Sequence, residues 1–105
     1  MEVPHIDVDE LASLPEPVLI DVRMPDEYVA AHVPGADLVP LPELAARSAE
    51  IPTDGTIYVI CASGGRSLRA CEHLRGLGVD AVNVAGGTKA WIEAGRPTAI
   101  GDTPR

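Results

Sequence analysis

The chain has 105 residues, 46% of them hydrophobic and 23% charged, which is enough for one hydrophobic core but not for two. Its formal net charge of -8 disfavours binding to nucleic acid or to an anionic membrane, because a polyanionic partner would be repelled. No apolar run reaches the ~20 residues that a membrane-spanning helix needs, and the N-terminus lacks the pattern of a signal peptide. With two cysteines and no export signal, we expect a cytoplasmic protein with free thiols.

Short β-branched runs alternate along the chain with segments of helical pattern. We expect strands at His5-Ile6, Val18 to Val22, Ala36 to Val39, Thr56 to Cys61 and Ala81 to Val84. We expect helices at Val8 to Ser13, Pro25 to Ala30, Pro42 to Arg47, Ser67 to Leu77 and Thr88 to Ala94. Apolar strands separated by helices are typical of a parallel sheet covered on both faces, so the sequence predicts an α/β domain of about five strands.

The clearest helical pattern begins at Ser67, which we expect to cap the helix. Its apolar residues share one stripe that should face the sheet: Ala70, Cys71, Leu74 and Leu77. Cys71 is therefore expected to be a small core residue, with the alternative that it resolves an oxidised Cys61. Gly76 and Gly78 fit the C-terminal cap of this helix.

The segment VICASGGRS places Cys61 at the carboxyl end of an expected strand, directly before a glycine-containing loop and a helix. Ligands of open α/β sheets bind beyond the carboxyl ends of strands, and a helix N-terminus offers unpaired N–H groups. Glycines let successive N–H groups converge on an anion, which favours thiolate over thiol. We therefore expect Cys61 to be a nucleophile rather than a buried core thiol. The expected binding loop consists of Ala62, Ser63, Gly64, Gly65, Arg66 and Ser67.

The interval between Cys61 and Arg66 distinguishes two anion chemistries. A phosphatase loop has about five residues between its cysteine and its arginine, because it wraps a tetrahedral phosphoryl group. Here four residues separate the pair, and Ser67 stands where a phosphatase would need the arginine. The tighter loop suits one extra sulfur atom on the cysteine, so the spacing favours sulfur transfer.

Three segments resemble motifs of the rhodanese family of sulfurtransferases. Residues 19–36, LIDVRMPDEYVAAHVPGA, are similar to the D-V-R…E-[YF]…G-H-I-P-G-A signature of that family. Residues 61–67, CASGGRS, are similar to its active-site loop, and residues 84–97, VAGGTKAWIEAGRP, to its G-G…W…G-x-P signature. The resemblance extends over roughly residues 4 to 98 in consistent order. It implies a single rhodanese-like domain over residues 1–105, with a short frayed C-terminal tail.

The resemblance also implies a fold and an activity. The fold would be a parallel five-stranded sheet flanked by helices on both faces. Cys61 would take a sulfane sulfur from thiosulfate or a persulfide, hold it as a persulfide, and pass it to cyanide, a thiol or a protein. No metal or organic cofactor is expected, and the protein would be a monomer or a homodimer. The alternative is a rhodanese-like module that binds partners or senses redox state or sulfur without catalysis.

Charges near the loop bear on the choice of sulfur donor. The loop residues other than Arg66 add no cation, and Glu27 brings an acid to the D-V-R segment, where some thiosulfate-using relatives carry a base. Arg66 would then be the only strong cation of the pocket, while Arg23 would pair with Glu27. Dianionic thiosulfate is therefore disfavoured as the donor, and a protein persulfide or glutathione persulfide is an open alternative.

Five other residues have two readings each. Asp21 and Arg23 end an expected strand on the sheet edge of Cys61, where they either line the pocket or support it structurally, and we favour support. For His32 we favour a structural hydrogen bond at the Pro34-Gly35 turn over a catalytic base. Trp91 is expected in the core rather than on a binding surface. Leu68 lies off the apolar stripe of its helix, near the mouth of the expected site.

Overall fold

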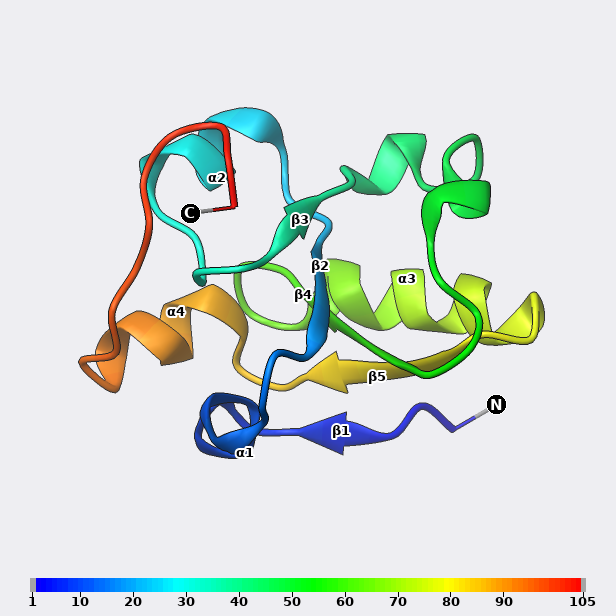
Figure 1. The fold of residues 1–105 in the computed structure, drawn as a ribbon, viewed down its shortest axis with the longest axis horizontal. Helices are drawn as coiled ribbons and strands as arrows, with labels where there is room; N and C mark the ends of the chain where they lie inside the picture. The colour runs from blue at the N-terminus through cyan, green and yellow to red at the C-terminus, as the bar shows by residue number, and fades with distance from the viewer. Residues whose placement is uncertain (1, 105) are drawn as a thin grey trace.

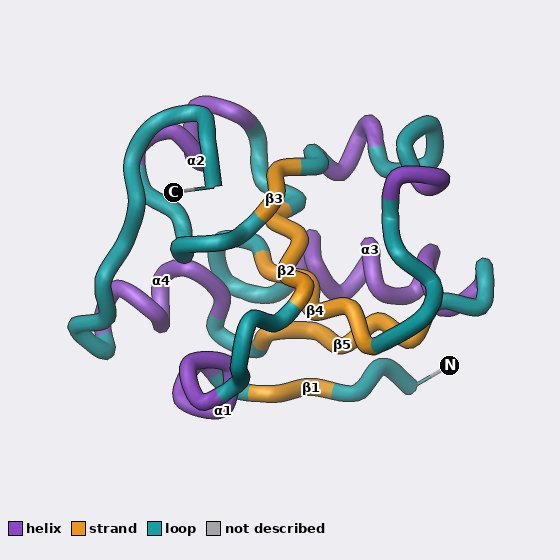
Figure 2. The backbone as a smooth tube through the Cα atoms, viewed as in Figure 1, coloured by secondary structure: helices purple, strands orange, loops and turns teal. Residues whose placement is uncertain are grey.

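Five parallel strands form one twisted sheet at the centre of the computed structural model, which describes residues 2–104 (Figures 1 and 2). The strands are β1 (His5–Ile6), β2 (Val18–Asp21), β3 (Asp37–Leu38), β4 (Thr56–Ile60) and β5 (Asp80–Val84). Their order in the sheet is β1-β5-β4-β2-β3, and every neighbouring pair is parallel. The five-stranded parallel sheet expected from the sequence is confirmed.

Within residues 2–104, three α-helices and two 3-10 helices connect the strands, and a fourth α-helix follows β5. The α-helices are α1 (Val8–Ser13), α2 (Pro25–Ala30), α3 (Gly65–Gly76) and α4 (Gly87–Glu93). The predicted helix from Pro42 to Arg47 is wrong, because this region forms the 3-10 helices η1 (Leu41–Glu43) and η2 (Ser48–Glu50). Only Leu44 is buried among residues 41–50, so a continuous helix would lack the apolar stripe that stabilises so short a segment.

Helices cover both faces of the sheet, as the sequence predicted. On β4 the buried side chains alternate: Ile57 and Val59 join the core that contains α3, while Ile60 joins the core of the opposite face. Trp91 of α4 and Tyr28 of α2 complete that opposite core. Cys61 follows the alternation and points toward α3.

The apolar stripe of α3 is one turn shorter than predicted. Ala70, Cys71 and Leu74 are fully buried, but Leu77 is 56% exposed. The helix ends at Gly76, so Leu77 lies outside it, followed by Gly78 with a φ of +87°. At the other end of the stripe the fully buried residue is Ser67.

Residues 101–104, part of the C-terminal tail that we expected to fray, are instead packed against α2 and the turn that follows it (Figure 1). Arg105 of that tail lies outside the described residues. The Gly101 N–H donates a 2.9 Å hydrogen bond to the Val29 carbonyl, and the Gly35 N–H donates a 3.0 Å bond to the Pro104 carbonyl. These backbone bonds hold residues 101–104 in place.

The fully buried His32 has the structural role that we favoured, although its partners differ from those expected. Its ring stacks on Tyr28, with 3.7 Å between the ring centroids. Nδ1 lies 2.8 Å from the Tyr28 carbonyl oxygen and Nε2 lies 3.3 Å from that of Pro104. The imidazole therefore links α2 to the C-terminal segment rather than bonding to the Pro34-Gly35 turn itself.

Replacing Leu74 by alanine tests how much α3 contributes to the core. We expect Leu74→Ala to lower the free energy of unfolding by about 2–5 kcal/mol, because it leaves a cavity against the sheet. The exposed Leu77 offers a matched control in the same segment, and Leu77→Ala should change stability by less than about 0.5 kcal/mol. Chemical denaturation of both variants makes the measurement, and equal losses would contradict the observed end of the stripe.

Candidate active site

The loop between β4 and α3 wraps around the sulfur of Cys61. Cys61 directly follows β4 and is only 1% exposed. The Gly64 N–H donates a 3.1 Å hydrogen bond to Cys61 Sγ. Gly64 has a φ of +114°, in the left-handed region that glycine adopts without the strain a side chain would add. This conformation turns a backbone donor back onto the sulfur.

Burial and hydrogen bonding shift the pKa of Cys61 in opposite directions. Burial raises it, because a thiolate loses hydration inside the protein. Hydrogen bonds from the Ser67 hydroxyl and from the N–H groups of Ser67, Gly64 and Ser63 lower it. The hydrogen bonds prevail, so the pKa of Cys61 lies below its ordinary value. The loop thus favours the thiolate, which is the nucleophilic form of cysteine.

Ser67 does not cap α3, contrary to the prediction. The N-cap is Gly64, because α3 begins two residues earlier than expected, and Ser67 therefore lies inside the first turn with its side chain facing the sheet. Its Oγ is 3.3 Å from Cys61 Sγ and 2.5 Å from Asn83 Oδ1. The hydroxyl contacts the reactive loop through the sulfur itself.

Arg66 is engaged by a carboxylate rather than left as an unpaired cation. Its guanidinium donates two hydrogen bonds to the carboxylate of Glu27, at 2.7 and 2.9 Å. The bond to Arg66 lowers the pKa of Glu27 to about 2. The pair is therefore complete above pH 4.5, the ordinary pKa of the carboxyl, and is lost as the pH falls toward 2. It fastens the first turn of α3 to α2.

Asp21 and Arg23 form a separate, buried ion pair. The Arg23 guanidinium donates to both carboxylate oxygens of Asp21, with a shortest distance of 2.8 Å, and also donates to the carbonyl of Ala31 at 2.8 Å. Arg23 therefore does not pair with Glu27, as we had expected. A buried bidentate pair leaves the arginine few donors for a ligand, so these contacts support the structural reading of both residues.

The start of α4 holds the same loop from behind. Thr88 donates two hydrogen bonds to the Cys61 carbonyl, from its N–H at 2.8 Å and from its hydroxyl at 3.0 Å. The Lys89 N–H donates to the Ala62 carbonyl at 3.0 Å. A Cβ on Gly87 would lie 2.5 Å from both carbonyl oxygens, so only glycine permits this approach. Gly87 and Thr88 were not predicted to hold the loop, although the letters G-G-T in the segment VAGGTKAW were their signal.

Asn83 is a further residue of the site that was not predicted from the sequence. It lies on β5, is 3% exposed, and faces the same side of the sheet as Cys61. Besides accepting from Ser67, it donates a 3.3 Å hydrogen bond from Nδ2 to the Gly64 carbonyl. The signal in the sequence was a single amide side chain inside the apolar run AVNV. The alternation of side chains along a strand turns this position inward.

A model of the rhodanese-like domain family matches residues 6–94, which include every element of this site. The chain belongs to the rhodanese-like domain family. A sulfurtransferase from Allochromatium vinosum is 36% identical over 88 residues, which cover 83% of this chain and 82% of that protein. Other curated relatives are longer, and the chain spans 59% of one and 23% of another.

Solved structures of the family match the fold closely. A rhodanese-related protein from Thermoplasma volcanium has a TM-score of 0.86 at 33% identity, covering 92% of this chain and 98% of that chain. A thiosulfate sulfurtransferase from Pseudomonas aeruginosa has a TM-score of 0.85 at 31% identity and covers 96% of this chain, but only 21% of that chain. The rhodanese-like domain described here is thus also found as one part of larger proteins.

Cys71 of this rhodanese-like domain is a core thiol, as expected. It is fully buried on α3, and burial raises its pKa to about 12. Leu68, one turn before it, is 36% exposed, in agreement with its expected place off the apolar stripe. The two cysteines therefore occupy opposite chemical environments within one core.

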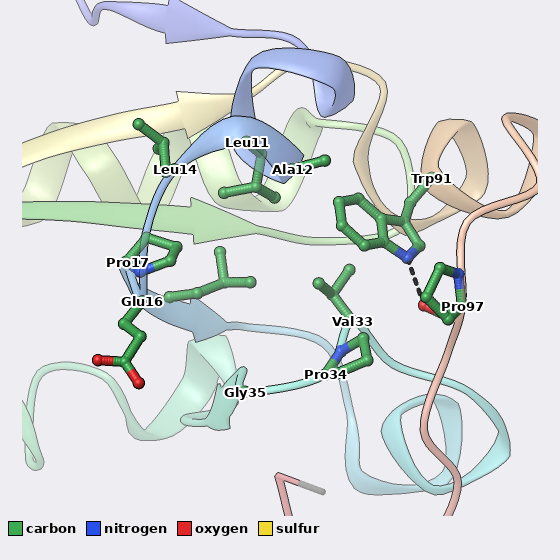
Figure 3. A pocket seen from close by; sticks show the side chains of 11 residues that line it. Leu11, Ala12, Leu14, Glu16, Pro17, Val33, Pro34, Gly35, Trp91 and Pro97 are labelled. Carbon is green, nitrogen blue, oxygen red and sulfur yellow. Dashed lines mark hydrogen bonds between the residues drawn. The ribbon is translucent and has the colours of Figure 1, made fainter.

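An apolar groove of about 570 Å³ is lined by side chains of α1, α4 and the segments that precede β2 and β3 (Figure 3). Leu14, Val33 and Pro97 line it together with Trp91, whose indole N–H donates a 2.8 Å hydrogen bond to the Pro97 carbonyl. Trp91 is 7% exposed, which confirms its expected place in the core. No residue of the loop 61–67 lines the groove, so it is separate from the sulfur site.

Within residues 2–104, no group of three or more His, Cys, Asp or Glu residues is placed to hold a metal ion. In the same range, no helix has both the length and the apolar character required to cross a membrane.

Alkylation of the two thiols tests the environments described above. At neutral pH we expect iodoacetamide to modify Cys61 and to leave Cys71 unmodified in the folded protein, because only Cys61 has a lowered pKa. The pH midpoint of the reaction should lie below ~8.5, the value of a free thiol. Peptide mass mapping identifies the site, and Cys61→Ser should abolish labelling. Labelling of Cys71 at a comparable rate would contradict the assignment.

Proposed function

We propose that this rhodanese-like domain is a sulfurtransferase that carries a sulfane sulfur on Cys61. The observation that carries the proposal is the ring of donors around Cys61 Sγ, formed by the Gly64 N–H at 3.1 Å and the Ser67 hydroxyl at 3.3 Å. The same donors that favour a thiolate can hold the anion of a persulfide. The similarity to a sulfurtransferase from Allochromatium vinosum supports this chemistry.

The proposed reaction has two half-reactions, each an attack by sulfur on sulfur. First, the Cys61 thiolate attacks the outer sulfur of the donor, and the S–S bond of the donor breaks. The leaving group takes the electron pair of that bond; it is a thiolate when the donor is a persulfide and sulfite when the donor is thiosulfate. Second, an acceptor thiolate attacks the outer sulfur of the Cys61 persulfide, and Cys61 leaves as the thiolate. The outer sulfur reaches the acceptor in the protonation state that it had on Cys61, so the transfer itself gains or loses no proton, and no external oxidant or reductant is consumed.

Intact mass spectrometry tests the covalent intermediate. After incubation with a persulfide donor or with thiosulfate, we expect one added sulfur atom, about 32 Da, that cyanide or dithiothreitol removes. Cys61→Ser should show no adduct, while Cys71→Ser, the matched control within the same core, should show the full one. If neither donor loads wild-type protein, the domain is a non-catalytic module, and the proposal is wrong.

We also propose that the donor is a persulfide of a thiol or a protein rather than thiosulfate. Arg66 is held by two hydrogen bonds from its guanidinium to Glu27, and Arg23 is held by Asp21. Residues 62–65 carry no charge. A dianion entering this loop would meet arginines already neutralised by carboxylates, whereas a persulfide with a smaller charge needs mainly the N–H donors.

Replacing Glu27 by glutamine tests the choice of donor. Glu27→Gln removes the carboxylate that neutralises Arg66, so we expect kcat/KM for thiosulfate to rise about threefold to tenfold, with a smaller change for a persulfide donor. Asp26→Asn is the matched control, since it removes an equal charge from the same helical turn without freeing Arg66. A fall in thiosulfate turnover with Glu27→Gln, or an equal rise with Asp26→Asn, would refute the proposed donor preference.

A further inference from the structure

The surroundings of the Asn83 side chain determine how its amide is oriented. Nδ2 lies 3.3 Å from the carbonyl oxygen of Gly64 and 3.4 Å from Nδ1 of His5. A carbonyl oxygen can only accept a hydrogen bond, so the amide NH₂ must face Gly64. Oδ1 then faces Ser67, and because an amide oxygen carries no proton, the Ser67 hydroxyl is the donor in that contact.

The Ser67 hydroxyl has one proton and two acceptors within reach. Asn83 Oδ1 lies 2.5 Å from Ser67 Oγ, and the Cys61 sulfur, once ionised, is a second acceptor at 3.3 Å. Ser67 has no exposed surface, so no water molecule from solvent reaches its hydroxyl to donate a further hydrogen bond. The short oxygen–oxygen distance indicates a strong bond, and the thiolate must therefore compete with Asn83 for the hydroxyl proton.

We propose that Asn83 is a positioning residue for Cys61, which keeps the Ser67 hydroxyl engaged and so limits how strongly that hydroxyl stabilises the thiolate. The inference rests on the proposed function in taking Cys61 as the reacting sulfur. Partial stabilisation of the thiolate suits a sulfur that both attacks and leaves. As the pKa of a thiol falls, its thiolate becomes a weaker nucleophile but a better leaving group. The backbone donor from Gly64 has no competing acceptor of this kind.

Other ionisable groups surround the sulfur or its partners, and they come from four elements. They are His5 of β1, Asp21 at the end of β2 with Arg23 beside it, Glu27 of α2, and Arg66 and Cys71 of α3. Only His5 contacts Asn83 directly. None of the remaining groups has a hydrogen bond or ion pair with Asn83, so we expect a change in Cys61 that follows its replacement not to come from them.

The test measures the pH midpoint of Cys61 alkylation by iodoacetamide, which does not require sulfur transfer. Asn83→Leu removes the competing acceptor, so the midpoint should fall enough to raise the thiolate fraction about threefold to tenfold at low pH. Ser67→Ala should raise the midpoint. In the Ser67→Ala background, Asn83→Leu should have no further effect, because its action runs through the hydroxyl.

Several controls keep the outcome decisive. Asn83→Ala serves if Asn83→Leu does not fold, since both remove the acceptor oxygen. Val82→Ala, a destabilising change on the same strand but the other face, should leave the midpoint unchanged, and so should His5→Gln. An unchanged or raised midpoint with both Asn83 variants, or the same shift with and without Ser67, would overturn the proposal. Failure to load sulfur with an intact alkylation result would refute only the proposed function.

Discussion

The hydrogen bonding of the Cys61 residue, on both its sulfur and its carbonyl, is the constraint on which the rest of the site depends. A backbone donor at the N-cap of α3 and a hydroxyl in its first turn reach the sulfur, while Thr88 of α4 holds the carbonyl of the same residue twice. The parallel sheet makes this possible, because it delivers the ends of β4 and β5 to one edge. The helices that follow those strands then meet around one loop.

The charges near the loop serve mainly to hold it together. Arg66 in the first turn of α3 and Arg23 just after β2 are each fastened by both oxygens of a carboxylate, Arg66 by Glu27 and Arg23 by Asp21. The anion at Cys61 is thus stabilised by oriented N–H groups and a hydroxyl rather than by an excess of positive charge. This arrangement is in keeping with a chain whose formal net charge is -8.

Local patterns in the sequence were enough to predict the sheet, the bounds of α1 and α2, and the loop that holds Cys61. What they missed depends on contacts between distant segments. Nothing near Arg66 in the sequence indicates that its partner is Glu27, 39 residues away. Ser67 looked like a helix cap because serine favours caps, yet an earlier helix start at Gly65 buries it beside Asn83. Leu77 fitted the helical period, but the helix ends before reaching it.

The close approach at Gly87 has a consequence for recombining parts of such domains. The backbone at Gly87 lies so near the Cys61 and Ala62 carbonyls that a single methyl group there would overlap both oxygens. The reactive loop and the start of α4 therefore form one steric unit, although 19 residues, 68–86, separate them along the chain. A chimaera that takes residues 61–67 from one relative must take the G-G-T turn from the same parent, or from a parent that also has glycine at the position of Gly87. Crossover points placed inside β5 would divide this unit, whereas those before β4 would leave it whole.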